Sequence, residues 1–195
     1  MIPWVRFLHD QEQPGRAYVC WTSPGHEKEL VVHDGHRGNA FREAVKRWGS
    51  FVCLDWDIAY DTCDMHVVET VVTERPDLVA MGPYLMFPSS TWKHNFGWHD
   101  TGERPEPVWS GMVWTGNDWR RITRDDQYCQ AFGFGLVYLP EKVIQLADQL
   151  GVLDQCIYPQ DDAVFSDFFW RQGGQARVLW DCVPKHLHFD LPDHG

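Results

Sequence analysis

The sequence lacks the features that would place the chain in a membrane or an oxidising compartment. It has no apolar run of the length that a membrane-spanning helix needs, and Arg6, His9 and Asp10 interrupt its first apolar residues. Its six cysteines include no Cys-x-x-Cys pair, and several lie in apolar runs, so we expect free, buried thiols. We therefore expect an intracellular, cytoplasmic protein without a membrane span.

Basic residues are also few. The chain of 195 residues has 17 Lys and Arg against 28 Asp and Glu, which gives a net charge of −11. This balance argues against a broad basic surface for nucleic acid, although it leaves room for a local one. The ten histidines include one close pair near the chain end, His186 and His188, so a zinc site made of histidines alone is not predicted. The length is that of one domain with a single buried sheet.

The most informative motif is Asp55-Trp56-Asp57, which directly follows the apolar run Phe51–Leu54. A buried strand that ends in this way puts two carboxylates at one edge of a sheet. Carboxylate oxygens are ligands that Mg²⁺ and Mn²⁺ prefer, and a diphosphate can share the ion. The motif alone fits a solvated turn equally well, so its meaning depends on the neighbouring sequence.

The residues before this strand predict a βαβ unit. A short strand over Glu29–His33 is followed by the Gly-rich turn Asp34–Gly38, and then by a helix that Asn39 caps and Gly49 ends. The turn and the Asp-x-Asp motif both follow strands that are expected to be parallel. We therefore expect Arg37, in the turn, to lie at the same edge of the sheet as the two acids.

The rest of the chain alternates strands and helices, which predicts an α/β fold. Further helices are expected over 62–75, 140–150 and 160–172, and further strands over 4–9, 17–22, 77–81, 131–139 and 175–180. Little helix is expected between the first two strands.

The stretch from Pro88 to about Asp126 has no such periodicity and is rich in tryptophan and arginine. Long unpatterned segments in compact domains are often functional. Tryptophan faces stack on sugars or bases, and arginine pairs with phosphates, so one interpretation is a binding groove. The other is a minor core of tryptophans with a solvated rim of arginines. The candidate residues of the groove are Trp92, Trp98, Trp114 and Arg121.

Several linked motifs resemble the GT-A fold of nucleotide-sugar glycosyltransferases, in particular small members similar to bacterial and bacteriophage family-2-like enzymes. They are the turn, helix and Asp-x-Asp strand of residues 37–57, the segment Pro76–Pro83, the Gly-rich strand Phe132–Pro140, the Asp-Asp-x-x-Phe helix start at Asp161–Phe165, and the turn and strand Gly173–Val178. A C-terminal histidine often completes the metal site in that family. The resemblance covers about residues 29–188.

The resemblance implies a single-domain α/β fold with a mixed, mostly parallel sheet flanked by helices. Residues 29–87 would form the donor and metal half, 88–126 the aromatic acceptor segment, and 127–189 the acceptor and catalytic half. The cofactor would be Mn²⁺ or Mg²⁺, bound by Asp57, with Asp55, His186 and His188 as further candidates. Donor contacts would come from Arg37, Asn39, Asp55, Trp56 and Gly133.

The resemblance also implies a general base at Asp162 or its neighbour Asp161, acting on an acceptor hydroxyl. The structural alternative is a pair of carboxylates that only accept backbone hydrogen bonds at a helix N-terminus. Both acids stay open as candidates for the base.

The function that the resemblance implies is transfer of a sugar from a nucleotide-diphosphate donor to a hydroxyl on a glycan, a protein or a hydroxymethylated base in DNA. A nucleotidyltransferase on a related α/β sheet is the enzymatic alternative, but it would need a Gly-rich phosphate loop that Gln13–Arg16 matches poorly. An inactive sugar-binding module is the non-enzymatic alternative. The presence of both acid pairs, at 55/57 and 161/162, favours an enzyme.

Overall fold

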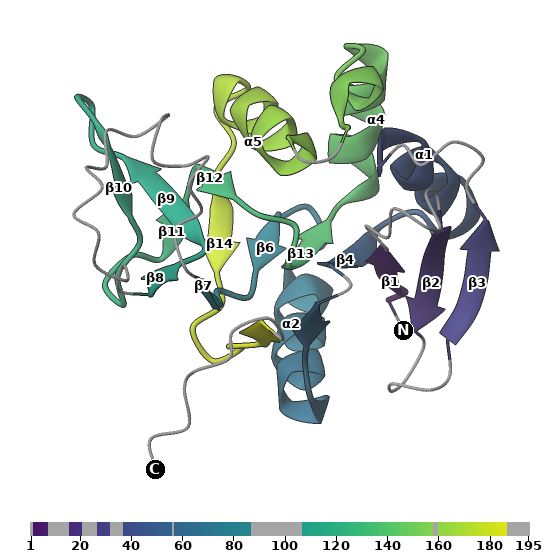
Figure 1. Cartoon of the computed structure of the whole chain (residues 1–195), viewed down its shortest axis with the longest axis horizontal. Helices are drawn as coiled ribbons and strands as arrows, with labels where there is room; N and C mark the ends of the chain where they lie inside the picture. The colour runs from purple at the N-terminus through teal and green to yellow at the C-terminus, as the bar shows by residue number, and fades with distance from the viewer. Residues whose placement is uncertain are drawn as a thin grey trace, which may run out of the picture.

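An eight-stranded mixed sheet forms the centre of the computed structural model, which describes residues 2–7, 16–20, 27–31, 37–55, 57–86, 107–157 and 160–186. The strands lie in the order β11-β14-β6-β13-β4-β1-β2-β3 (Figure 1). They are β1 (Trp4–Phe7), β2 (Arg16–Cys20), β3 (Glu27–Val31), β4 (Phe51–Asp55), β6 (Ala80–Met81), β11 (Tyr128–Cys129), β13 (Leu136–Leu139) and β14 (Ala176–Val178). The expected α/β class is confirmed.

The pairing within this sheet differs from the expected one. Only two neighbouring pairs are parallel, β1 with β4 and β6 with β14, so a mostly parallel sheet is wrong. A parallel neighbour needs a crossover of a dozen or more residues, and only residues 8–15 and 21–26 separate β1, β2 and β3. These three strands therefore pair antiparallel, and β13 lies antiparallel between β4 and β6.

The predicted βαβ unit nevertheless brings its two ends to one edge. Two antiparallel steps separate β3 from β1, so β3 points the same way as β1 and β4. Helix α1 (Arg37–Trp48) connects β3 to β4 across the two strands between them. The start of α1 and the end of β4 therefore meet at the same edge, as the sequence predicts.

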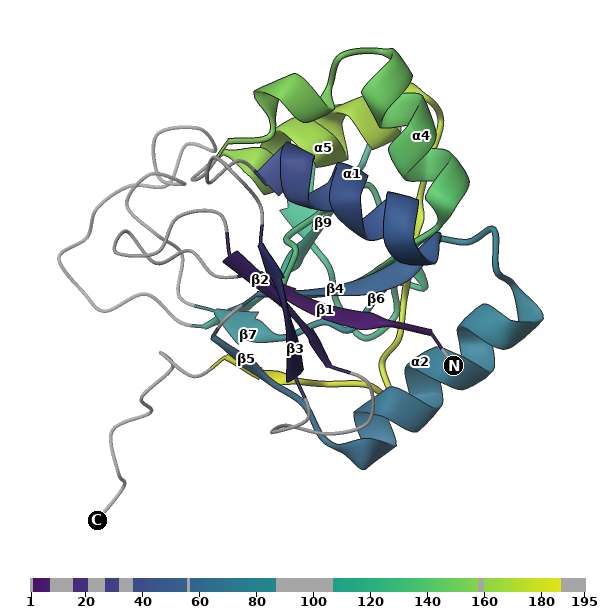
Figure 2. The same ribbon diagram turned by 90° about the vertical axis from the view of Figure 1, so that its right-hand side faces the viewer.

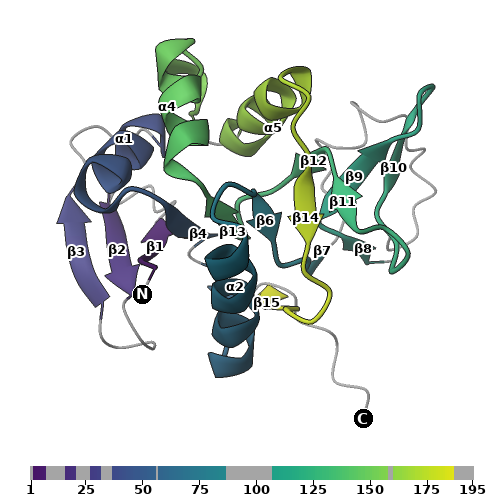
Figure 3. The same cartoon turned by 180° about the vertical axis from the view of Figure 1, so that it is seen from behind.

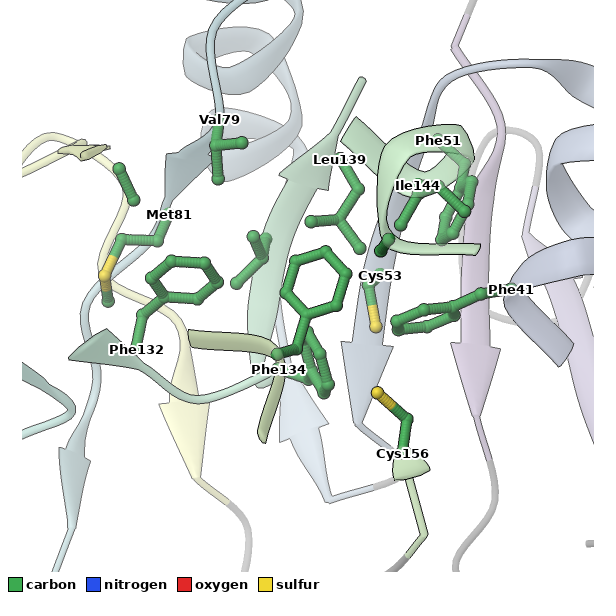
Figure 4. Close-up of a cluster of buried hydrophobic side chains, with 14 of the residues drawn as sticks. Phe41, Phe51, Cys53, Val79, Met81, Phe132, Phe134, Leu139, Ile144 and Cys156 are labelled. Atoms are coloured by element: carbon green, nitrogen blue, oxygen red, sulfur yellow. The ribbon is translucent and has the colours of Figure 1, made fainter. Parts of the chain in front are cut away.

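Helices cover both faces of the sheet. Figure 2 shows α1, α4 (Glu141–Gln149) and α5 (Asp161–Arg171) on one face and α2 (Thr62–Glu74) on the other. Alternate residues of β4 supply the two cores: Phe51 and Cys53 pack under α1, α4 and α5 (Figure 4), whereas Val52 and Leu54 pack with residues of α2. This alternation is the period-two pattern of a strand that is buried on both faces.

Helices α2, α4 and α5 agree with their expected bounds within a few residues. Helix α2 has the capping box Asp61–Asp64, α4 follows Pro140, and Gly49 and Gly151 end α1 and α4 with φ of 73° and 70°. The expected cap at Asn39 is wrong, because α1 begins at Arg37 and Asn39 lies in its first turn.

The expected strand over 131–139 is split into β12 (Ala131–Phe132) and β13. Gly133 and Gly135 separate the two parts, and a side chain at either position would collide with Tyr84. The expected strand over 77–81 is limited to the two residues of β6. The split of the strand follows from the close approach of Tyr84, which the periodicity of the sequence does not contain.

A second, three-stranded sheet lies beyond the β11–β14 end of the main sheet (Figure 3). Its order is β10-β9-β12, with β9 at Gly111–Trp114 and β10 at Trp119–Arg121. The described residues also form two short strand pairs: β7 (Leu85–Met86) with β8 (Val108–Trp109), and β5 (Ile58–Ala59) with β15 (Lys185–His186). The described part of the segment that has no periodicity thus contains β8, β9 and β10.

No helix within the described residues is long and apolar enough to cross a membrane. The cysteines whose side chains are described, at 53, 63, 129, 156 and 182, are free, and all but Cys63 are buried. The expectation of free, mostly buried thiols is confirmed for these five.

Candidate functional site

The candidate site lies where β4 ends and where α1 and α5 begin. Arg37, the first residue of α1, forms two ion pairs: its Nη1 lies 2.8 Å from Asp55 Oδ1, and its Nε lies 2.7 Å from Asp161 Oδ2. The side chains of Arg37 and Asp161 are only 4% and 5% exposed. One buried guanidinium therefore joins the first acid of the Asp-x-Asp motif to the acid pair of α5.

Aromatic rings and charge hold Arg37 in place. Its guanidinium lies 5.3 Å from the centre of the Phe7 ring and 5.2 Å from that of Phe134. Burial alone lowers the pKa of the Arg37 guanidinium, but the carboxylates of Asp55 and Asp161 outweigh it, so the pKa is raised. Arg37 is thus a fixed positive charge. The sequence predicts a donor contact for Arg37 but not this bridging role.

Hydrogen bonds to the main chain fix the Asp-x-Asp segment. Arg6 Nη1 donates to the carbonyl oxygens of Asp55, at 3.0 Å, and of Ile58, at 2.8 Å. The Asp55 N–H donates to the Gly135 carbonyl at 3.1 Å. The end of β4 is therefore held between β1 and the Gly-rich segment before β13.

The two acids of α5 have different surroundings. Asp161 is buried and paired with Arg37, whereas Asp162 accepts a hydrogen bond at its Oδ1 from the Ala163 N–H at 2.7 Å. Burial, followed by the nearby charges of Asp161 and Asp55, raises the pKa of Asp162 to about 7. Of the two candidates for the base, Asp162 has an affinity for protons that suits neutral pH.

Asp57 lies beside a C-terminal histidine. His186 on β15 pairs with Ile58 on β5, and its Nε2 lies 3.1 Å from Asp57 Oδ2. These are two of the four predicted metal ligands, whereas a third, Asp55, pairs with Arg37. Among the residues that the structure describes, no group of three or more His, Cys, Asp or Glu side chains is arranged to hold a metal ion. His188, the fourth ligand candidate, lies outside them.

Tyr84 lies next to His186 and near the acids Asp55, Asp57 and Asp162, and the sequence alone did not identify it as a site residue. Its buried ring stacks on that of His186, with centroids 5.6 Å apart and an angle of 9° between the planes. Burial and then the charges of Asp55, Asp162 and Asp57 raise the pKa of the Tyr84 phenol well above its usual value. The signal that could have found Tyr84 is the glycine pair at 133 and 135, because glycine within a strand often marks a close approach of another group.

The predicted acceptor residues have separate positions. Arg121 is half-buried near Tyr84, and its Nη1 donates to the Trp109 carbonyl at 3.3 Å. Burial lowers the pKa of Arg121, and the Tyr84 phenol opposes this effect. Trp114 packs with Trp119 and Trp170, at centroid distances of 5.4 and 5.9 Å. This cluster of half-buried tryptophans combines β9, β10 and α5.

The remaining predicted residues are placed as follows. Gly133 lies against Tyr84 and Asp162. Asn39 accepts a hydrogen bond at its Oδ1 from Arg42 Nη1 at 2.5 Å, in a network with Asp148 and Asp154. Trp56, Trp92 and Trp98 lie outside the described residues. Asn39 thus contributes to the packing of α1.

The site carries surplus negative charge. Three carboxylates, those of Asp55, Asp57 and Asp162, act on the Tyr84 phenol, and the Arg121 guanidinium opposes them. Arg37 and Asp161 adjoin this group through the ion pair of Arg37 with Asp55. Burial is the main cause of the raised pKa values of Asp162 and Tyr84, and the neighbouring carboxylates raise them further because they disfavour additional negative charge. An arrangement of this kind can attract a cation and can take up a proton near neutral pH.

Comparison of the chain with protein-family models, with curated proteins and with solved structures finds no match. A functional assignment for this chain therefore depends on the chemistry of the site itself.

Proposed function

We propose that the chain is a metal-dependent glycosyltransferase that moves a sugar from a nucleotide-diphosphate donor to an acceptor hydroxyl. The observation that carries the proposal is the meeting of two acid pairs at one sheet edge. Arg37 pairs with both Asp55 and Asp161, and the charges of the remaining acids, Asp57 and Asp162, both act on Tyr84. Binding of a diphosphate and activation of a hydroxyl need separate groups at a short distance, and this arrangement supplies both.

Asp57 and His186 are the residues that fit a divalent cation. A carboxylate oxygen and an imidazole nitrogen within 3.1 Å of each other are ligand types that Mn²⁺ accepts, and the surplus negative charge favours a cation there. When bound, the ion neutralises negative charge on the departing nucleoside diphosphate. Asp55 is already paired with Arg37, so we assign it to the positioning of Arg37 and of the donor.

Asp162 is the residue that fits the general base. A base works best when its pKa lies near the working pH, and a carboxyl with a pKa of about 7 meets this condition. Asp161 fits the role less well, because its Oδ2 pairs with the permanent charge of Arg37. In the proposed reaction, Asp162 takes the proton of the acceptor hydroxyl. The hydroxyl oxygen bonds to the sugar carbon, and the nucleoside diphosphate leaves.

The test is a screen of UDP-, GDP-, CDP- and dTDP-sugars with Mn²⁺ or Mg²⁺, using release of nucleoside diphosphate as the readout and methyl glycosides as acceptors. We expect one donor class to react, at a rate that increases with pH and levels off above about pH 7 as Asp162 ionises. Asp162→Asn should lower single-turnover transfer by roughly 10²–10⁴-fold while donor affinity stays close to the wild-type value.

The matched control is Asp167→Asn, since Asp167 lies on the same helix but is exposed and paired only with Arg171 in the next turn. It should leave transfer unchanged. Donor binding without any transfer by the wild type would identify a sugar-binding module, and wild-type transfer by Asp162→Asn would remove the base from the proposal.

A further inference from the structure

The main chain of Gly133 borders the space between two oxygen atoms of the site. A Cβ atom at this position would lie 2.9 Å from Tyr84 Oη and 3.4 Å from Asp162 Oδ2. Both oxygens therefore lie within 3.4 Å of one point, which a side chain at residue 133 would occupy. The point is one bond length from the Gly133 Cα, so a ligand atom cannot lie at the point itself. A ligand atom can lie beside the point.

Both oxygens are held in their positions. Asp162 accepts the Ala163 N–H at its Oδ1, which leaves Oδ2 on the side of Gly133. The Tyr84 ring fits against Gly135, where a Cβ would come 2.1 Å from Cε1, and it stacks on His186. The Tyr84 main chain pairs with Ser110 through two hydrogen bonds, of 3.1 Å from Tyr84 N to Ser110 Oγ and 2.9 Å from Ser110 N to Tyr84 O.

We propose that Tyr84 is a catalytic residue that, together with Asp162, holds the attacking hydroxyl of the acceptor beside Gly133. This inference rests on the proposed glycosyltransferase function. Tyr84 donates its phenolic hydrogen to the hydroxyl oxygen, and the hydroxyl donates its own hydrogen to Asp162 Oδ2. The hydroxyl is thus oriented by one donor and one acceptor before it reacts.

The proton and electron pairs can be followed through the step. One lone pair of the hydroxyl oxygen accepts the Tyr84 O–H, and the other forms the bond to the sugar carbon. The bond from that carbon to the diphosphate oxygen breaks, and its electrons leave with the nucleoside diphosphate. The acceptor proton ends on Asp162, whereas the phenol keeps its own hydrogen throughout.

This arrangement selects the class of acceptor. An oxygen nucleophile has two lone pairs and can accept the Tyr84 hydrogen bond while it attacks. A neutral amine has a single lone pair and cannot do both, so Tyr84 favours hydroxyl over amine acceptors. Gly133 contributes by leaving room for the acceptor.

The experiment compares Tyr84→Phe with the wild type in single-turnover transfer, using the sugar nucleotide and methyl glycoside that react fastest in the wild type with Mn²⁺. Phenylalanine keeps the ring that packs on Gly135 and His186, so only the phenolic oxygen is lost. We expect transfer to decrease by roughly 10–100-fold, with affinity for the nucleoside diphosphate and Mn²⁺ unchanged. Tyr128→Phe, on the exposed edge strand β11, is the matched control and should transfer normally.

Gly133→Ala provides an independent arm. Its methyl group should block the acceptor, and Tyr84→Phe/Gly133→Ala should fold as well as Tyr84→Phe, because the phenolic oxygen nearest the new methyl is absent. Transfer should stay low in the double variant. The wild type should prefer a methyl glycoside to its amino-deoxy counterpart as the acceptor. Loss of this preference in Tyr84→Phe would support the argument that Tyr84 selects hydroxyl acceptors.

The outcomes separate the two proposals. If the wild type transfers no sugar from any donor, the glycosyltransferase function fails and this inference fails with it. If the wild type transfers sugar and Tyr84→Phe does so at the same rate, only the role of Tyr84 is overturned. An equal loss of transfer and of nucleoside diphosphate affinity in Tyr84→Phe also overturns it, because Tyr84 then acts on the donor.

Discussion

At the scale of single residues, the buried guanidinium of Arg37 is the centre of the site. Its carboxylate partners are Asp55 at the end of β4, 18 positions further along the chain, and Asp161 at the start of α5, 124 positions further along. A buried ion pair contributes little net stability by itself, but removal of one partner leaves the other charge buried and unpaired. Loss of Arg37 should therefore lower the free energy of unfolding mainly because Asp161 would stay buried without a counter-charge.

We expect Arg37→Met to lower the free energy of unfolding by about 3–5 kcal/mol, because Asp161 would stay buried without its counter-charge. The matched control is Arg42→Met on the same helix. Arg42 also pairs with two acids, Asp148 and Asp154, but all three side chains are substantially exposed, so the loss should be within about 1 kcal/mol. Urea unfolding of both variants measures the difference, and equal losses would contradict the buried role of Arg37.

The raised pKa of Asp162 predicts a pH dependence of stability that needs no substrate. The pKa is about 7 in the folded chain against an ordinary value of 3.8, so between these values the folded state holds a proton that the unfolded state has lost. The free energy of unfolding therefore decreases as pH rises through this interval. Since the carboxyl is only partly shielded from solvent, we expect a decrease of about 1–3 kcal/mol from this residue.

Asp162→Asn should remove this contribution, so the variant should be more stable than the wild type at pH 8 and lose the advantage near pH 4. Urea unfolding at several pH values measures it, with Asp167→Asn as the exposed control on α5. A stability difference that does not vary with pH would show that the pKa of Asp162 is not raised.

At the scale of elements, close contacts between backbones position the site. Helix α1 meets the 3₁₀ helix η1 (Leu153–Gln155) at Gly38, directly after Arg37, where the Gly38 N–H donates to the Cys156 carbonyl at 3.3 Å. A Cβ at Gly38 would come far too close to the Leu153 carbonyl oxygen, at 1.9 Å. The start of α1, and with it Arg37, can approach η1 only because residue 38 has no side chain.

We expect Gly38→Ala to destabilise the fold by about 2–4 kcal/mol, because the backbones of α1 and η1 must separate. The control is Gly151→Ala, where the new methyl would meet open space and only the positive φ of 70° opposes it, at a cost of about 1 kcal/mol. Thermal unfolding compares the two. If Gly151→Ala were the more damaging change, the contact of α1 with η1 would not be what fixes the start of the helix.

At the scale of the whole molecule, the fold concentrates negative charge at one place of an already acidic chain. The net charge of the protein is −11, and three carboxylates of the site, Asp55, Asp57 and Asp162, act on one tyrosine, Tyr84. Two nucleotide phosphates would add further negative charge. Binding of a nucleoside diphosphate should therefore require a divalent cation.

We expect Mn²⁺ and UDP or GDP together to raise the melting temperature by roughly 5–10 °C at about 100 times the dissociation constant, whereas either alone should have a much smaller effect. Asp57→Asn should abolish the joint shift and leave the unliganded melting temperature nearly unchanged, since Asp57 lies in the turn after β4. Asp118→Asn, in the exposed turn between β9 and β10, is the control. A shift that persists in EDTA would contradict a metal-dependent site.

The chain by itself determined most helices and the central strand. The period of its apolar residues, the caps and the glycines that end helices are local signals, and they locate α2, α4, α5 and β4 within a few residues. The shared edge of Arg37 and Asp55 also follows from sequence order, because a helix that connects two parallel strands returns to the same edge.

Only the tertiary structure decided the rest. The antiparallel pairing of β1, β2, β3 and β13, the burial of Asp161 against Arg37, and the position of Tyr84 against two glycines all depend on contacts between segments far apart in the chain. The contrast between the surroundings of Asp161 and Asp162 is of the same kind. The two acids are neighbours with identical side chains, but the fold pairs Asp161 with Arg37 and buries Asp162 where its pKa is raised.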